Sequence, residues 1–330
     1  MIAGFLFCLL MPTQWLGAVY GAEMGPLHVR QRYPLYLMFL MPEPDSPRQV
    51  EKGSFLASVS TDYTSIYINE SNQDWSVLMD MEATVVDLSL TYGVTKQGNV
   101  SLTLPWISLN GGFLDGPLEV YHGFFGFPDY GRGEAPSDEF GYHVTLDGDA
   151  WFDARPGGMQ LGESVVTVKW QLTEAGIHKG LGSSLLYALK IPTGDEERGL
   201  GSGRFDQGFI LLNQYSIAPL VLYLNPGIVF LSDPVTKGAH IQVKDMVTLL
   251  AGIEYQVSDT WSWMGQVNFL TSPFHHTGIE QMDRDSLELT LGGVIRVSDQ
   301  MVFELAFSED VTRTAPDFTV HGSLRYEFGS

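Results

Sequence analysis

Apolar and polar residues alternate with a period of two along several long stretches of this sequence. Between residues 247 and 257 the odd positions are apolar, and the even positions are polar or glycine except for Leu250. Residues 287–297 and 317–328 repeat the pattern. Because successive side chains of a β-strand point to opposite faces, each stretch would form a strand with one apolar and one polar face. About ten such residues, tilted, can cross a bilayer, so the pattern is typical of a transmembrane β-barrel.

Twelve segments are candidate strands. They lie at about 54–68, 77–92, 100–108, 162–173, 181–191, 205–217, 220–231, 245–257, 261–271, 286–297, 300–308 and 317–328. In the second half of the chain short connections alternate with long, charged ones, as outer-membrane barrels require. A soluble β-sandwich is the alternative, but its strands are usually only about five or six residues long.

The predicted fold is therefore all-β: a transmembrane, antiparallel, up-and-down β-barrel with a short helical insert. The barrel has 12 strands, or 14 if the segment 140–154 adds a hairpin across Asp147-Gly148-Asp149. An even total follows because the strands must alternate in direction between the two sides of the membrane.

The first residues predict export. Residues 2–11 are almost all apolar and small residues follow at 17–22, which is typical of a secretory signal peptide over residues 1–22. No Lys or Arg precedes the apolar run, and a buried N-terminal helix is the alternative. No second run of about eighteen apolar residues follows, so only closed strands could carry the backbone through a membrane. The predicted location is the outer membrane of a Gram-negative bacterium.

Residues 23–50 form a leader that contains several prolines and an apolar patch at 35–41 without regular alternation. We expect this leader to lie in the periplasm or to dock in the barrel lumen, and a disordered tail is the alternative. The barrel would then span residues 51–330.

The segment 109–139 interrupts the alternation. Leu114, Leu118, Tyr121 and Phe125 fall on one side of a short helix, which could fold into the barrel mouth as a plug or lie at the lipid interface. The candidate residues of this insert are Phe113, Asp115, Glu119, His122, Phe125 and Arg132.

The insert also carries a family resemblance. Residues 111–116 (Gly-Gly-Phe-Leu-Asp-Gly) and 125–128 (Phe-Gly-Phe-Pro) resemble an uncharacterised family of proteobacterial outer-membrane proteins known only by a domain-of-unknown-function label. The leader, the segments 189–194 and 201–206 and the tail 315–318 extend the resemblance over nearly the whole mature chain. The segment 201–206 and the tail are also similar to barrels encoded near aromatic-degradation genes. The resemblance implies an outer-membrane barrel and no particular activity.

The composition of the chain limits the classes of binding partner that it can have. A formal charge of −21 argues against nucleic acid and would suit a pore that prefers cations. The single cysteine, Cys8, lies within the predicted signal, so no thiol chemistry is expected in the mature chain. The expected partners are outer-membrane lipids, the barrel assembly machinery and periplasmic chaperones.

Inward-facing positions supply the candidate lumen residues. They are Lys169, Lys190, Asp206, Glu254, Arg296, His321 and Arg325. We assign no catalytic residue, cofactor or metal. His321 and Ser323 share a strand face, but i,i+2 spacing puts them about 6.5–7 Å apart along the strand. His275 and His276 lie in a loop with Glu280, Asp283 and Asp285, which could gather a metal ion. Adjacent histidines in a loop rarely form a tight site without convergent partners, so this is a weak metal candidate.

The predicted function is a passive outer-membrane channel or carrier for small molecules, including hydrophobic ones, gated by the 109–139 insert. The alternatives are a non-conducting structural or interaction barrel and, with less weight, a lipid-modifying enzyme.

Overall fold

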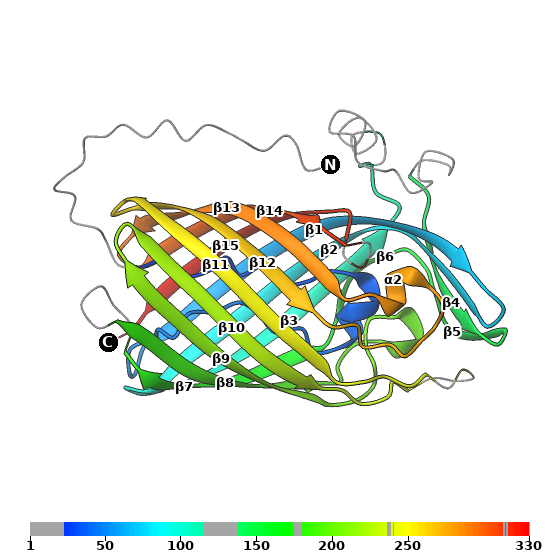
Figure 1. Ribbon diagram of the computed structural model, residues 1–330, viewed down its shortest axis with the longest axis horizontal. Coiled ribbons are helices and arrows are strands. Elements are labelled where there is room, and N and C mark those ends of the chain that lie inside the picture. Colours follow the sequence, from blue (N-terminus) through cyan, green and yellow to red (C-terminus); the bar gives the residue numbers. More distant parts are fainter. Residues whose placement is uncertain are drawn as a thin grey trace.

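The computed structural model describes residues 23–114, 116, 138–174, 180–235, 239, 241–312, 314 and 316–329, so the predicted signal peptide lies outside the described residues. In this part of the chain, twelve strands form one closed antiparallel barrel (Figure 1). They are β1 (Phe55–Ser71), β2 (Trp75–Thr95), β3 (Gly98–Asn110), β7 (Ser164–Thr173), β8 (Leu181–Ile191), β9 (Asp206–Ile217), β10 (Leu220–Phe230), β11 (Met246–Ser258), β12 (Trp261–Leu270), β13 (Ser286–Ser298), β14 (Met301–Asp310) and β15 (Phe318–Phe328).

The barrel closes between its first and last strands. β15 pairs with β1 from Phe55 opposite Phe328 to Ser65 opposite Phe318. Every predicted strand segment overlaps an observed barrel strand. The predicted fold class and the count of 12 are therefore confirmed.

The count of 14 is wrong. The predicted hairpin exists as β4 (Gly141–Leu146) and β5 (Asp149–Ala154), but its arms are only six residues long. β4 pairs with residues 75–80 of β2, the end of that strand next to the β1–β2 connection. β6 (Gly157–Leu161) likewise pairs with the end of β3. These three strands extend the barrel wall beyond the end that holds the β1–β2 connection and do not cross the barrel.

The two ends of the barrel differ. Short turns such as 218–219, 259–260 and 299–300 lie at one end, which we call the turn end. The long connections lie at the other, the loop end, together with the 3-10 turn η3 (Glu196–Arg198) and the helix α2 (Glu280–Asp283) (Figure 1). No helix within the described ranges is long and apolar enough to span a bilayer.

The alternation in the sequence sets the two faces of the wall. On β11 the exposed fractions of Val247, Ile253 and Val257 are 50%, 45% and 41%, whereas Leu250 and Glu254 point inward and are buried. The same outward apolar face recurs around the barrel, which gives it a surface suited to lipid.

The inward face is not polar throughout, contrary to the simple expectation for a barrel. Near the loop end, inward side chains of the barrel and its extensions form an apolar cluster around residues 33–41 of the leader. We call this cluster the apolar hub. It includes Met79, Met81, Ile107, Tyr142, Trp151, Phe274 and Met282. These positions are apolar because they pack against the leader and the loops instead of water.

The leader passes through the lumen and turns back. Glu23 contacts Ser216 near the turn end, and the chain then reaches the hub, where the 3-10 helix η1 (Pro34–Met38) is fully buried. It returns to the turn end, where Gly53 donates to the carbonyl of Gly93 before β1 begins. Figure 1 shows η1 in dark blue inside the barrel, near the end that holds α2.

Candidate functional site in the lumen

Two arginines of the outgoing leader limb bind carboxylates of the barrel wall. Arg32 donates from Nε to Asp62 and from Nη2 to Asp87, both at 2.7 Å. Arg30 donates to the same oxygen of Asp87 at 2.7 Å. Burial by itself would lower the pKa of Arg32, but Asp62 and Asp87 raise it above the ordinary value. The guanidinium of Arg32 is therefore charged and compensates two buried carboxylates.

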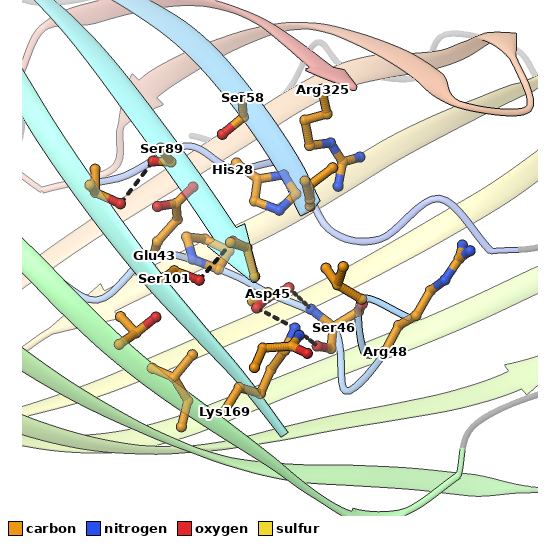
Figure 2. Close-up of a pocket in the computed structure, with 18 of the residues that line it drawn as sticks. His28, Glu43, Asp45, Ser46, Arg48, Ser58, Ser89, Ser101, Lys169 and Arg325 are labelled. Carbon is orange, nitrogen blue, oxygen red and sulfur yellow. Dashed lines mark hydrogen bonds and ion pairs between the residues drawn. The ribbon is translucent and has the colours of Figure 1, made fainter. Parts of the chain in front are cut away.

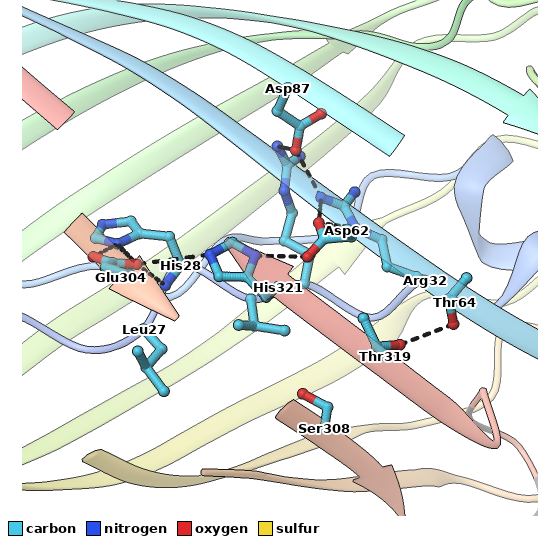
Figure 3. Close-up of polar contacts among 12 residues, drawn as sticks. Leu27, His28, Arg32, Asp62, Thr64, Asp87, Glu304, Ser308, Thr319 and His321 are labelled. Atoms are coloured by element: carbon cyan, nitrogen blue, oxygen red, sulfur yellow. Dashed lines mark hydrogen bonds and ion pairs between the residues drawn. The ribbon is translucent and has the colours of Figure 1, made fainter. Parts of the chain in front are cut away.

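A histidine extends this network along the wall. His321 Nδ1 lies 2.6 Å from Asp62, and its Nε2 lies 3.7 Å from Glu304. Glu304 also contacts His28 Nδ1 at 3.0 Å and Arg325 at 2.7 Å. Figure 3 shows His321 between the two carboxylates and His28 of the leader beyond Glu304. We call these charged residues, with Arg30, Arg32 and Asp87, the lumen charge network.

A buried lysine holds the turn of the leader. Lys190 Nζ lies 2.8 Å from Asp206 and 3.4 Å from Glu163, and it donates to the carbonyl of Met38 at 2.6 Å. Asp206 in turn accepts from the backbone N–H of Leu40 at 3.1 Å. Lys190 and Asp206 thus connect the wall to the peptide groups on both sides of Phe39, the residue that follows η1.

This arrangement gives a structural role to the segments 189–194 and 201–206, which carry part of the family resemblance. Glu163 accepts the backbone N–H groups of Thr193, Gly194 and Ser202, which brings the two segments together. A Cβ atom at Gly194 would lie 2.1 Å from the carbonyl oxygen of Leu200, so glycine is required at this close approach.

A cavity of about 310 Å³ lies beside the returning limb, residues 42–50. Its wall includes hydroxyl side chains of β2, β3 and β7, and its turn end includes Arg296, Asp299 and Gln300. Figure 2 shows Lys169 of β7 reaching Asp45 and Ser46 of the leader. The lumen is therefore occupied by the leader and only partly filled.

All seven lumen candidates of the sequence analysis lie on the inner face of the barrel. Glu254 accepts from Tyr223 at 2.6 Å and Ser262 at 2.7 Å and binds the leader at Met24 N–H. Arg296 borders the cavity and donates to the carbonyl of Asp259. The other five are Lys169, Lys190, Asp206, His321 and Arg325, described above, of which Lys169 and Arg325 also border the cavity.

Sequence reasoning missed the partners of these residues. Arg30, Arg32, Asp62, Asp87 and Glu163 were not singled out, although all five are buried. A usable signal was present for Asp62 and Asp87. Each is a charge at an inward position in the middle of a predicted strand, and buried charges require a partner.

Only the start of the insert is described. Phe113 is 64% exposed, and its ring lies 5.6 Å from that of Tyr63, which points outward from β1. Its backbone N–H donates to Glu82, also on the outward face, at 3.0 Å. Asp115, Glu119, His122, Phe125 and Arg132 lie outside the described residues.

The geometry around His321 does not fit a serine hydrolase. Its ring nitrogens face Asp62 and Glu304, so neither nitrogen is directed at Ser323. In the metal candidate loop, Asp283 accepts from Thr277 and Gly278 N–H and so stabilises the loop. No cluster of three or more metal-ligating side chains occurs among the described residues.

The comparisons with known proteins agree with this fold. Residues 7–328 match a family of proteins of unknown function, DUF3187, as the sequence resemblance predicted. No curated protein sequence matches the chain. The COG4313 outer membrane channel from Pseudomonas putida F1 is similar in structure, with a TM-score of 0.58 and 14% identity over 87% of this chain and 100% of that one.

Two other solved structures are less similar. The CymD monoaromatic hydrocarbon channel has a TM-score of 0.42 and 10% identity over 85% of this chain and 89% of that chain. The NanC porin has a TM-score of 0.44 and 6% identity over 82% of this chain and 98% of that chain. The similarity to the COG4313 channel agrees with the observed barrel fold, and the chain belongs to the DUF3187 family of proteins of unknown function.

Proposed function

We propose that this protein is a passive outer-membrane channel for small molecules, including hydrophobic ones, and that the leader is its plug. The observation that carries the proposal is the content of the lumen. A separate segment, residues 23–50, occupies it and is held at defined points such as Arg32 and Lys190, with a cavity of about 310 Å³ left beside it. A barrel built only as a rigid structure would be expected to fill its interior with its own side chains.

The apolar hub supports a cargo with apolar surface. A molecule that enters from the loop end meets Met79, Met81, Trp151 and Phe274 before it reaches the charge network. Methionine side chains are flexible and polarisable, and they adapt to apolar ligands of different shape. An apolar molecule could therefore replace contacts that the leader makes in this closed state.

The rival proposal is a non-conducting barrel that serves as a structural or interaction element. Planar-bilayer recording of the purified protein separates the two. A channel shows stepwise currents or cargo flux once the leader is displaced, whereas a packed barrel stays silent in every variant.

The insert is a second candidate restriction, and its deletion tests this role. Its described start lies on the outward face near Tyr63, so we expect deletion of residues 111–130 to change conductance less than displacement of the leader does. Single-channel recordings of the deletion and of wild type provide the measurement. Conductance steps that grow as much after this deletion as after leader displacement would make the insert the main gate.

A further inference from the structure

The cavity beside the leader has one wall of uncharged hydroxyl groups. Ser89 and Thr91 of β2 face Thr103 and Ser101 of β3, and the hydroxyl oxygens are 2.8 Å and 2.7 Å apart in the two pairs. All four residues border the cavity, and Ser58 and Thr167 extend the wall on either side. A hydroxyl can donate once and accept twice, so each pair retains one donor and several acceptors. This wall can bind a ligand oxygen without carrying charge.

The side-chain amide of Asn99 is buried at the same wall of the cavity. Asn99 of β3 borders the cavity and is 2% exposed, yet neither its Nδ2 nor its Oδ1 has a hydrogen-bond partner among the described residues. Buried amide groups in folded proteins are almost always hydrogen-bonded. The unpaired donor and acceptor of Asn99 therefore indicate that a molecule bound in the cavity places a polar group beside this side chain.

Three of the cations that border the cavity, Lys169, Arg30 and Arg325, are paired with carboxylates, whereas Arg48 borders it without an ion pair among the described residues. Lys169 binds Asp45 at 2.7 Å, Arg30 binds Asp87 at 2.7 Å, and Arg325 reaches Glu304, also at 2.7 Å. The remaining surface includes apolar side chains, among them Leu56, Val165, Leu186 and Val302. Because these three cations are already compensated, an anion bound beside them would gain little and would lose its hydration.

We propose that this cavity is an internal binding site for small uncharged molecules that carry a hydroxyl or carbonyl group on an apolar body. The inference rests on the proposed channel function, because it names the class of cargo that would pause inside the barrel. The volume of about 310 Å³ is at the lower end of the range for small-molecule sites, so the occupant is a compact molecule.

Cyclohexanol is a suitable probe, and methionine methyl groups can report where it binds. Met24 and Met41 border the cavity, and Met41 also packs in the hub, whereas Met79 and Met282 belong to the hub and do not line the cavity. The full mature protein, labelled with ¹³C-methyl methionine in lipid nanodiscs, would be titrated with cyclohexanol and, separately, with cyclohexanecarboxylate. We expect saturable shifts of the Met24 and Met41 signals with the alcohol and weaker binding of the carboxylate. Equal binding of the two probes, or shifts confined to Met79 and Met282, would overturn the proposal.

Matched variants test the chemistry of the wall. Asn99→Leu is expected to weaken cyclohexanol binding about tenfold, the value of roughly one hydrogen bond. Thr103→Val removes one wall hydroxyl at nearly constant shape and should weaken binding as well. The control is Thr290→Val, because Thr290 forms a similar buried hydroxyl pair with Ser308 at 2.7 Å but does not line the cavity. Unchanged affinity in Asn99→Leu and Thr103→Val together would refute the assignment.

This binding measurement is independent of transport, because it is made at equilibrium with the leader in place. Site-specific binding without any current or flux in leader variants would support the cavity site and reject the channel. Current or flux without binding would reject the cavity site alone.

Discussion

Deletion of residues 24–49 is expected to turn a closed barrel into an open pore. These residues supply both limbs of the leader and its apolar turn, so their removal empties the lumen from the turn end to the hub. A barrel of twelve strands lies between small barrels that side chains fill and large ones with aqueous channels. We expect the mean single-channel conductance in planar bilayers to rise on the order of tenfold, because the wall alone does not fill this lumen.

A point substitution tests the same prediction in case the deletion variant fails to fold. Leu35 is fully buried in the hub, and Leu35→Asp places a charge there without a partner, which should expel the turn while the rest of the leader remains. The matched control is Lys52→Asp, an exposed position beyond the returning limb. If the deletion and Leu35→Asp both fold and neither conducts better than wild type, the leader is not the gate.

Replacement of Arg32 by methionine is expected to cause the largest loss of stability from a single substitution in the leader. Arg32 compensates Asp62 and Asp87, which are 0% and 4% exposed, so its loss leaves buried negative charge. Removal of one partner from a buried ion pair typically costs about 3–5 kcal/mol. Arg30 still contacts Asp87 and His321 still contacts Asp62, so the lower part of that range is expected. The measurement is urea unfolding of the reconstituted protein.

A second substitution in the Arg32→Met variant distinguishes the loss of charge compensation from the loss of packing. Adding Asp62→Asn to Arg32→Met should recover part of the lost free energy of unfolding, because one uncompensated carboxylate disappears. Arg48→Met is the control, since Arg48 is an exposed leader residue without an ion pair among the described residues. Arg48→Met should lower the free energy of unfolding by no more than about 0.5 kcal/mol. A loss in Arg32→Met no larger than in Arg48→Met would contradict a structural role for the charge network.

The barrel strands could be predicted because alternation is a local property. The predicted strand at 245–257 differs from β11 by one residue at each end. The lengths of the first two strands were underestimated where the two strands meet. β1 runs on to Ser71, and β2 already begins at Trp75, so both extend beyond the membrane-facing alternation. At those ends the strands are held by each other, by β4 and by the hub, and no lipid boundary limits their length.

The path of the leader could not be read from the sequence in the same way. Its segment 35–41 has no strand or helix period, and its contacts join residues far apart in the chain, such as Met38 with Lys190. Only the barrel geometry brings these residues together. The lumen candidates were found because inward positions follow from alternation, whereas their partners on the leader follow from no periodic rule.

Cross-linking of the leader to the inner wall tests the central claim most directly. The mature chain contains no native cysteine after the predicted signal, so the pair Asp45→Cys and Lys169→Cys can be examined without background. The control pair is Asp45→Cys with Trp170→Cys, because Trp170 is the next residue on β7 and points outward, 48% exposed. In intact outer membranes treated with a short thiol-to-thiol reagent, we expect a cross-link for the Lys169 pair and none for the Trp170 pair. Efficient cross-linking of the Trp170 pair, or none in either pair, would contradict a leader inside a closed membrane barrel.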